Sequence, residues 1–307
     1  MTDRWRHLEV ADQYGRRAIV TGANTGLGYV STLALARAGA EVVMAVRDLD
    51  RGQVAAQRIR KQEPEAKLRV IHLDLASLAS VYDFAQAQVD DGPVDILMNN
   101  AGVMLVPTRE RTANGFERHM GINHLGHFAL TARLLPALLR SPGARVVSVT
   151  SLTYARVGPL DHGLGLTGDY TPMRAYGQSK LAVAVFGLEL QRRLHAAGLP
   201  VTSVLAHPGW SATAETQPND DAARSVRLAR RATAILGSPP AQGARAQVYA
   251  ATAASLAGGE LVGPRWLGRG APAAATLAAV AADPVAARWL WNESARLTGA
   301  DPGLGAT

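Results

Sequence analysis

Near its start the chain reads Thr21-Gly22-Ala23-Asn24-Thr25-Gly26-Leu27-Gly28, directly after the short apolar run Ala18-Ile19-Val20. The three glycines suit a bound dinucleotide: Gly22 allows a tight bend, Gly26 lets the backbone approach a pyrophosphate, and Gly28 lets a helix pack closely on the strand. The phosphates would then meet N–H groups at the N-terminus of that helix. The turn therefore predicts a nucleotide-binding site, and the alternative is a glycine loop that holds no ligand.

Apolar runs rich in β-branched residues alternate with longer helical patterns along the first two thirds of the chain. The expected strands are Arg17–Val20, Glu41–Val46, Leu68–Leu73, Val94–Met98, Ala144–Val149 and Pro200–Leu205. The expected helices are Leu27–Ala38, Asp50–Gln62, Ser77–Val89, Thr112–Arg140 and Arg174–Ala197. Because each strand is almost continuously apolar, the pattern predicts a parallel sheet covered on both faces. We expect an α/β chain with one domain over residues 1–307, a Rossmann-type doubly wound sheet.

Beyond Gly209 the alternation loosens into polar helices and turns rich in glycine and proline. We expect this region to cover a substrate rather than to extend the nucleotide-binding fold. It divides into a lid at about residues 210–240 and a C-terminal extension at about residues 262–307.

Composition excludes several classes of function. The 307 residues include no cysteine, which excludes disulfides and thiolate chemistry, and the histidines do not have a metal-ligand spacing. The net charge of +7 comes from scattered basic residues with no basic block interleaved with aromatics, so we expect no nucleic-acid binding. The polar start, Met1 to His7, and the lack of a long uncharged apolar stretch predict a soluble, cytoplasmic protein without a transmembrane segment.

A phenol and an ammonium group stand one helical turn apart in Tyr176-Gly177-Gln178-Ser179-Lys180. Free tyrosine has a pKa of about 10, and a cation within about 4–6 Å lowers the pKa of an acid by about 1–3 units. Tyr176 could then accept a proton from an alcohol or return one to a carbonyl. The alternative is an ordinary surface pair, because Y-x-x-x-K is common in helices.

Polar residues at the ends of the fourth and fifth strands support the first interpretation. Ser151 follows the strand Ala144–Val149, at the edge of the sheet where ligands bind in such folds, and its hydroxyl could hold a substrate oxygen. The other strand is followed by Asn99-Asn100-Ala101-Gly102, whose amides can brace loops while Gly102 leaves room for a cofactor. Asn123 is a polar residue on an otherwise apolar helix, where a packing amide is the alternative role.

Cofactor choice is expected to depend on the end of the second strand, Ala45-Val46-Arg47-Asp48. An acidic residue at this place often binds the ribose hydroxyls of NAD. Here an arginine could instead bind a 2′-phosphate with its forked guanidinium. We therefore expect NADP(H) rather than NAD(H), with a solvated surface role for Arg47 as the alternative.

Four motifs taken in order resemble the short-chain dehydrogenase/reductase family: T-G-x-x-x-G-x-G, N-N-A-G, a serine after the fifth strand, and Y-x-x-x-K. Within the family the chain is most similar to the retinol-dehydrogenase-like and protochlorophyllide-reductase-like branch. The segments that carry this likeness are T-G-A-N-T-G, Asn123 to Phe128, His207-Pro208-Gly209 and the ending Arg288 to Asn292.

The resemblance implies a catalytic tetrad. Tyr176 would be the acid/base, Lys180 would bind the nicotinamide ribose and lower the tyrosine pKa, Ser151 would orient the substrate oxygen, and Asn123 would hold a relay water. The cofactor contacts expected from the motifs are Gly22, Asn24, Thr25, Gly26, Leu27, Gly28, Arg47, Asp74, Leu75, Asn100, Ala101, Gly102, Tyr176, Lys180, Pro208, Gly209 and Thr213.

These residues predict an NADP(H)-dependent oxidoreductase that moves hydride between nicotinamide and the carbinol or carbonyl carbon of a small lipophilic alcohol, aldehyde or ketone. A catalytically silent NADP(H)-binding sensor or scaffold is the alternative. A sugar-nucleotide epimerase fits less well, because its usual turn is T-G-x-x-G-x-x-G. The two longest expected helices suggest dimer faces, and hence a homodimer or homotetramer.

Overall fold

The computed structural model describes residues 10–165, 167–209, 239–266 and 269–305. Within them, one eight-stranded sheet has the order β3-β2-β1-β4-β5-β6-β7-β8, with β1 to β7 parallel and β8 antiparallel to β7. The strands are β1 Arg17–Thr21, β2 Glu41–Val46, β3 Leu68–His72, β4 Ile96–Asn99, β5 Ala144–Val149, β6 Val201–Ala206, β7 Leu261–Trp266 and β8 Arg269–Ala275. The doubly wound α/β fold predicted from the sequence is confirmed.

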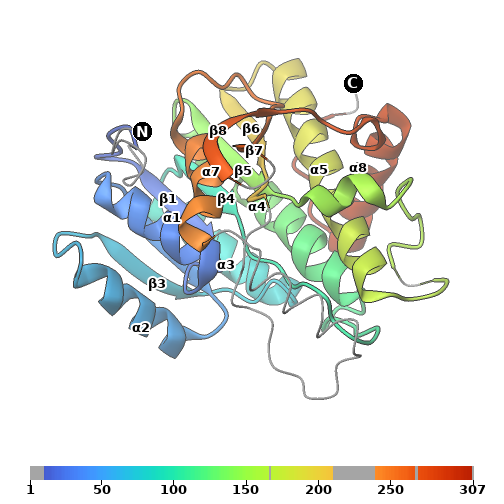
Figure 1. Ribbon diagram of the computed structural model, residues 1–307, viewed down its shortest axis with the longest axis horizontal. Coiled ribbons are helices and arrows are strands. Elements are labelled where there is room, and N and C mark those ends of the chain that lie inside the picture. Colours follow the sequence, from blue (N-terminus) through green and yellow to red (C-terminus); the bar gives the residue numbers. More distant parts are fainter. Residues whose placement is uncertain (1–9, 166, 210–238, 267–268, 306–307) are drawn as a thin grey trace.

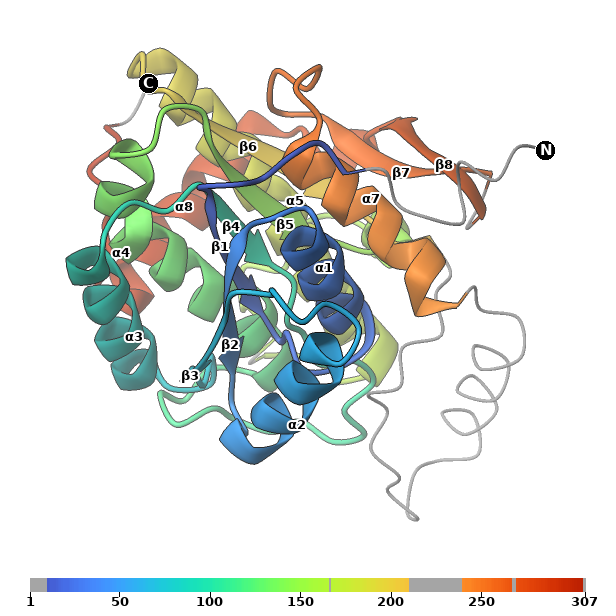
Figure 2. The same cartoon turned by 90° about the vertical axis from the view of Figure 1, so that its left-hand side faces the viewer.

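Helices cover both faces of this sheet (Figures 1 and 2). The α-helices are α1 Gly26–Arg37, α2 Leu49–Arg60, α3 Leu78–Asp91, α4 Gly126–Leu139, α5 Pro172–Ala196, α7 Pro240–Thr252 and α8 Pro284–Thr298. The shorter helical segments are the π-helix η2 Met120–Leu125 and the 3₁₀ turns η3 Leu152–Arg156 and η4 Ala279–Ala281. Apolar side chains from α1, α2 and α7 form a core on one face, and those from α3, α4 and α5 form a core on the other. Since both faces are buried, the strands need no polar alternation.

The expected helix Thr112–Arg140 was wrong as one continuous element. Its first part is a turn, in which Gly115 has φ +82° and its N–H donates to the Thr112 carbonyl. The next part is η2, where Gly126 N–H donates to the carbonyl of Gly121, five residues back. Only from Gly126 onward does the regular helix α4 run. Short π-helical segments inside helices are frequent at functional sites.

The prediction that the chain beyond Gly209 would not extend the nucleotide-binding fold was also wrong. β7 pairs in parallel with β6, and β8 closes the edge as a hairpin partner of β7. The helix before them, α7, packs against α1. The expected lid largely lies outside the described residues, because these omit residues 210–238.

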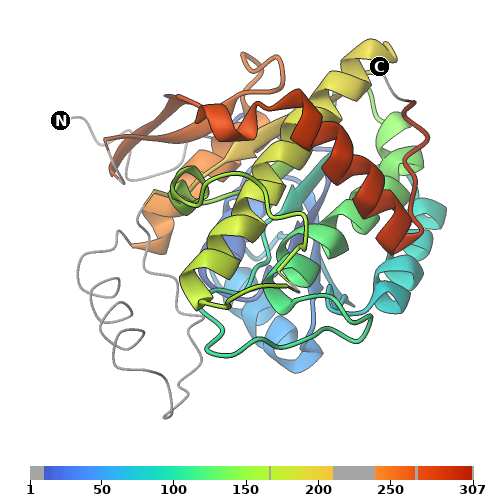
Figure 3. The same ribbon diagram turned by 90° about the vertical axis from the view of Figure 1, so that its right-hand side faces the viewer.

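Helix α8 lies on the outer side of α5 and α4 (Figure 3). Its Trp291 is 4% exposed and meets Phe128 of α4 with the rings in a T-shaped arrangement. The two helices that were expected to present dimer faces are thus partly covered by the chain's own C-terminal helix. Among the described helices, none is both long and apolar enough to cross a membrane.

Candidate active site

The strand order reverses between β1 and β4, and in open α/β sheets ligands bind at the carboxyl ends of the strands at such a point. The glycine turn leaves β1 there, and Asn100 to Gly102 leave β4 beside it. A Cβ added to Gly22 would lie 3.1 Å from the Ala101 side chain, so the two turns are in close contact. The sequence motifs that were expected to bind one cofactor therefore lie side by side.

The glycines of the turn are required for two geometric reasons, a left-handed backbone and close packing. Gly22 has φ +66° and Gly26 has φ +51°, in the left-handed region that glycine occupies without strain. A Cβ on Gly28 would overlap the Gly22 carbonyl oxygen and lie 2.7 Å from Asn100 Nδ2. Nothing lies within 4 Å of the Cβ position at Gly26, where α1 begins, and Leu27 is buried behind it. This open helix N-terminus fits the pyrophosphate of a dinucleotide.

The Asn100 side chain braces the two turns. Its Nδ2 donates to the Thr21 carbonyl at 2.8 Å, and its Oδ1 accepts from Gln247 Nε2 of α7 at 3.0 Å. The Thr21 hydroxyl accepts from the N–H groups of Asn100 and Ala101 and bonds His127 Nε2 at 2.9 Å. The bracing role expected for these amides is present, whereas Gln247 and His127 were not foreseen.

The second strand ends in the two residues on which the cofactor prediction depends. Arg47 is exposed directly after β2. Asp48 is the N-cap of α2, and its Oδ1 accepts from Arg51 N–H at 3.0 Å. The Asp48 carboxylate is therefore engaged by its own helix.

The adenine contacts expected after β3 are half-buried or buried. Asp74 Oδ1 accepts from Ala76 N–H at 2.9 Å, and the Asp74 N–H donates to Ser80 Oγ. Leu75 is buried and packs against Gly126 at the start of α4. Both residues lie at the carboxyl edge of the sheet, where a nucleotide would extend away from the glycine turn.

The four proposed catalytic residues come from three parts of the chain. Ser151 follows β5, Asn123 lies in η2, and Tyr176 and Lys180 stand one turn apart on α5. A Cβ on Gly102 would lie 3.1 Å from Asn123 Oδ1 and 3.4 Å from Lys180 Nζ, so both polar groups converge on the chain that leaves β4. The Ser151 hydroxyl lies close enough to the Tyr176 phenol to affect its pKa. The structure thus brings all four together beside the turns.

Lys180 is buried, 5% exposed, and its Nζ donates to the carbonyl of Val149 at 2.8 Å. Burial in this setting penalises the charged ammonium and lowers the pKa of Lys180 to about 8. At neutral pH the group remains largely protonated.

The pKa of Tyr176 departs from the expectation. Burial raises the pKa of this phenol, and the nearby Ser151 hydroxyl opposes that rise only in part. The Lys180 Nζ lies 6.0 Å from the centroid of the Tyr176 ring, with its hydrogen bond directed at the Val149 carbonyl. The net shift of the Tyr176 pKa is therefore upward rather than downward as expected, because loss of hydration has the largest effect.

Asn123 is fixed by hydrogen bonds on both sides of its amide. Its Oδ1 accepts from Val103 N–H at 2.8 Å, while its Nδ2 donates to the Val103 carbonyl and to Ser179 Oγ. Its main-chain carbonyl accepts from His127 Nδ1 at 3.0 Å. The residue is thus a fully engaged buried group of the site, not a solvent-facing amide.

The turn that follows β6 forms a further part of the predicted cofactor site. Gly209 has φ +68°, and its N–H donates to His207 Nδ1 at 3.1 Å, which bends the chain around Pro208. A Cβ on Gly263 of β7 would overlap the His207 ring, so the seventh strand holds this bend in place. The contact predicted at Thr213 and the possible pocket residue Trp210 lie outside the described residues.

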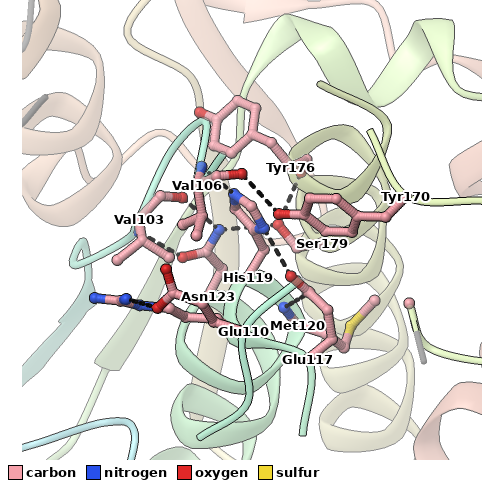
Figure 4. A network of polar contacts seen from close by, with 12 residues as sticks. Val103, Val106, Glu110, Glu117, His119, Met120, Asn123, Tyr170, Tyr176 and Ser179 are labelled. Atoms are coloured by element: carbon pink, nitrogen blue, oxygen red, sulfur yellow. Dashed lines mark hydrogen bonds and ion pairs between the residues drawn. The ribbon is translucent and has the colours of Figure 1, made fainter. Parts of the chain in front are cut away.

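Sequence reasoning missed a buried polar network beside Tyr176 (Figure 4). Glu117 Oε1 bonds His119 Nδ1 at 2.8 Å, and the His119 ring meets the Tyr176 ring edge-on with centroids 6.2 Å apart. Val106 N–H donates to His119 Nε2 at 3.3 Å, and Tyr170 Oη donates to the Val106 carbonyl at 2.8 Å. The signal in the sequence is slight: two polar residues spaced two apart before an apolar helix.

A small, partly open hollow adjoins this network. Its lining includes Arg109, Arg174, Asp161 and Tyr170, but neither Tyr176 nor Ser151. The hollow is therefore distinct from the site at the end of the strands.

Comparisons with known proteins agree with this geometry. The family model described as short chain dehydrogenase matches residues 16–224. Polyprenol dehydrogenase of Mus musculus is 46% identical over 301 residues, covering 95% of this chain and 86% of that relative. Retinol dehydrogenase 13 of Homo sapiens is 39% identical over 291 residues, with coverages of 93% and 85%.

Solved structures give the same picture. A crystal structure of an uncharacterized protein from Mycobacterium Paratuberculosis has a TM-score of 0.79 and 37% identity, covering 96% of this chain and 98% of that one. The RhlG/NADP active-site complex of Pseudomonas aeruginosa has a TM-score of 0.63 and 26% identity, with coverages of 82% and 96%. The chain belongs to the short-chain dehydrogenase/reductase family of oxidoreductases, in its retinol-dehydrogenase-like group.

Proposed function

We propose that the protein is an NADP(H)-dependent oxidoreductase that interconverts a lipophilic alcohol and its aldehyde or ketone. The observation that carries the proposal is the convergence of Ser151, Tyr176, Lys180 and Asn123 next to the glycine turn. A bound nicotinamide would supply or accept the hydride.

The protein's own residues handle the proton and the substrate oxygen. Ser151 holds the oxygen beside Tyr176 Oη, and Oη donates a proton to the carbonyl oxygen during reduction or accepts one during oxidation. The Lys180 ammonium, buried and directed by the Val149 carbonyl, stabilises negative charge that develops on the phenol. Asn123 accepts a hydrogen bond from Val103 N–H and so fixes the conformation of the segment after β4.

Three observations support NADP(H) over NAD(H). Arg47 is exposed at the end of β2, the place where the 2′-position of the adenine ribose is recognised in this kind of fold. The neighbouring Asp48 carboxylate is held at the N-terminus of α2, where its Oδ1 accepts the Arg51 N–H. A structural neighbour of 26% identity is described as an NADP complex.

The lipophilic substrate class rests on two observations. The relatives that match nearly the whole chain carry the names polyprenol dehydrogenase and retinol dehydrogenase. The segment after β4, which Asn123 contacts at Val103, also bears an apolar pair. This pair, Met104 and Leu105, packs apart from the main cores.

The test is reduction of retinaldehyde, a long isoprenoid aldehyde and a short aliphatic aldehyde, followed by the loss of NADPH absorbance at 340 nm. Wild-type protein should turn over at least one of them, and Tyr176→Phe should lower kcat by about 10²–10⁴-fold while NADPH still binds. Tyr14→Phe, which changes an exposed tyrosine, is the matched control. Thermal stabilisation by NADPH with no turnover of any aldehyde would instead support the silent-sensor alternative.

A further inference from the structure

The segment Val103 to Val106, which leaves β4, is held at both ends by buried side chains. Asn123 bonds both main-chain polar groups of Val103. At the other end, His119 accepts from the Val106 N–H and Tyr170 donates to the Val106 carbonyl. Between the two anchors Leu105 has φ +54°, a conformation that costs energy for a residue with a branched side chain.

The hydrogen bonds fix one tautomer of His119. Because Val106 N–H donates to Nε2, that nitrogen carries the lone pair, so the hydrogen is on Nδ1 and points to Glu117 Oε1. The second oxygen of Glu117 accepts from Met120 N–H at 2.8 Å. Reversal of the tautomer would place two N–H groups face to face at Val106.

Glu117 and His119 are 1% and 0% exposed, and a carboxylate is rarely buried unless its oxygens are bonded. Burial opposes ionisation, but the bonds from His119 and from Met120 N–H together hold the pKa of Glu117 below its usual range. The bond between this buried carboxylate and Nδ1 also orients the His119 ring, which points to a task beyond packing.

The position of the pair indicates that task. The His119 ring contacts the Tyr176 ring in a T-shaped arrangement, and its centroid lies 6.4 Å from that of the Tyr170 ring. Figure 4 shows the network lying between the Val103 and Val106 backbone and helix α5. Met104 and Leu105 therefore lie between one anchor, Asn123, and the other, His119, whose ring contacts the phenol ring that the proposed reaction uses.

We propose that Glu117, His119 and Tyr170 are positioning residues that hold Met104 to Val106 as an apolar wall of the substrate pocket and so set selectivity for bulky lipophilic substrates. This inference rests on the proposed function. None of the three residues is required for the proton transfer itself.

The first test compares His119→Phe with His119→Gln. Phenylalanine keeps a ring of similar size but cannot accept the Val106 N–H, whereas glutamine offers an acceptor oxygen near the place of Nε2. For His119→Phe we expect KM for a long isoprenoid aldehyde to rise about tenfold, with little change in kcat or in either parameter for a short aldehyde. His119→Gln should stay within about threefold of wild type.

Two further variants test the rest of the network. Glu117→Gln can present N–H groups to His119 Nδ1 and so favour the wrong tautomer, and Tyr170→Phe removes the bond to the Val106 carbonyl. Like His119→Phe, both variants should lower kcat/KM for the long aldehyde relative to kcat/KM for the short aldehyde. His195→Phe, which changes an exposed histidine at the far end of α5, is the control and should leave the ratio unchanged.

Hydrogen exchange at the Val106 amide gives a readout that is independent of turnover. Protection should fall about tenfold or more in His119→Phe and persist in His119→Gln. An unchanged Val106 amide, or a folded His119→Phe that loses activity equally on long and short aldehydes, overturns the inference. Absence of turnover in the wild type overturns the proposed function instead, and the exchange experiment still decides whether His119 holds Val106.

Discussion

Lys180 Nζ donates a 2.8 Å hydrogen bond to the carbonyl oxygen of Val149, the last residue of β5. The bond joins the central helix α5 to the carboxyl edge of the sheet, and Thr150 Oγ1 adds a second link by donating to the Lys180 carbonyl at 2.7 Å. The ammonium is thereby fixed in a dry environment, where a charge acts more strongly than in water. Its low solvation is also why its pKa falls to about 8.

Replacement of this lysine tests its proposed role. Lys180→Met should lower kcat/KM by about 10²-fold or more, because the transition state loses a preorganised charge. Lys67→Met changes a lysine whose ammonium lies over the ring of the exposed Tyr14, and it should have no such effect. Steady-state rates measured with saturating NADPH provide the comparison, and near wild-type activity of Lys180→Met would rule out the role.

The same group should give the cofactor-free protein an unusual alkaline profile. The pKa of Lys180 is about 8 in the folded protein and near 10.5 when unfolded, so between these values the unfolded chain binds more protons. Stability should therefore rise as pH increases from 8 to 10. Urea denaturation at several pH values should show this rise in the wild type and a flatter curve in Lys180→Met; equal slopes would contradict it.

Three buried histidines predict acid sensitivity. Burial lowers the pKa of His124 to about 3 and those of His127 and His207 to about 4. Below pH 6.5 the unfolded chain takes up protons at these residues and the folded protein does not, so stability falls as pH drops toward 4. At pH 4 each of these histidines lowers the free energy of unfolding by up to about 3 kcal/mol.

His124 offers the cleanest check of this acid sensitivity. Its Nε2 bonds Ser294 Oγ of α8 at 2.8 Å, and an amide in His124→Gln can replace that contact without titrating. The variant should lose less stability than the wild type between pH 6.5 and 4 in urea denaturation. His195→Gln, at an exposed histidine, should follow the wild-type curve.

Much of the fold could be predicted because its signals are local. The observed bounds of β1 to β6 lie within two residues of the expected bounds. A strand buried on both faces is almost continuously apolar, so its own sequence is enough to identify it. Ser151, Tyr176 and Lys180 could be found in the same way, because short spacings place them. By contrast, β8 reads Arg-Gly-Ala-Pro-Ala-Ala-Ala, and its strand conformation comes from pairing with β7 rather than from propensity.

The missed features of the site depend on contacts between distant segments. His119 acquires its place through Val106 and Tyr170, the latter 51 residues further along the chain. The direction of the Tyr176 pKa shift depends on the burial of the phenol. The spacing between Tyr176 and Lys180 in the sequence gives no information about that burial. Tertiary packing therefore determines both the position of His119 and the direction of the Tyr176 pKa shift.

Gly28 is predicted to tolerate no side chain. A Cβ there would overlap the Gly22 carbonyl oxygen and press on Asn100 Nδ2, so Gly28→Ala must separate the two turns. Overpacking of this kind costs about 1–3 kcal/mol, and NADPH affinity should fall with it. Gly305→Ala has nothing within 4 Å and is the control, and both variants can be compared by thermal unfolding and nucleotide fluorescence. Unchanged stability and affinity in Gly28→Ala would refute the packing argument.

The C-terminal helix should behave as part of the core. Trp291 packs against Phe128 and Phe186, and the Arg193 guanidinium lies 4.4 Å from its ring centroid. Trp291→Ala should cost about 3–5 kcal/mol of unfolding free energy. Trp266→Ala, at a tryptophan that is 70% exposed, should change stability by less than about 0.5 kcal/mol. Similar losses in the two variants, measured by urea denaturation, would show that α8 does not contribute this packing.

Arg47 should set the choice between the two nicotinamide cofactors. A charge-assisted bond from its guanidinium to a 2′-phosphate is worth about 1.5–3 kcal/mol, so Arg47→Ala should raise KM for NADPH by roughly 10–100-fold and leave KM for NADH almost unchanged. Arg58→Ala, at an exposed arginine of α2, controls for the loss of one positive charge. Asp48→Asn should also leave the preference intact, since an asparagine oxygen can still accept the Arg51 N–H that Asp48 now caps. If Arg47→Ala raises KM for both cofactors equally, the arginine acts on a part of the nucleotide common to both, and the 2′-phosphate contact is excluded.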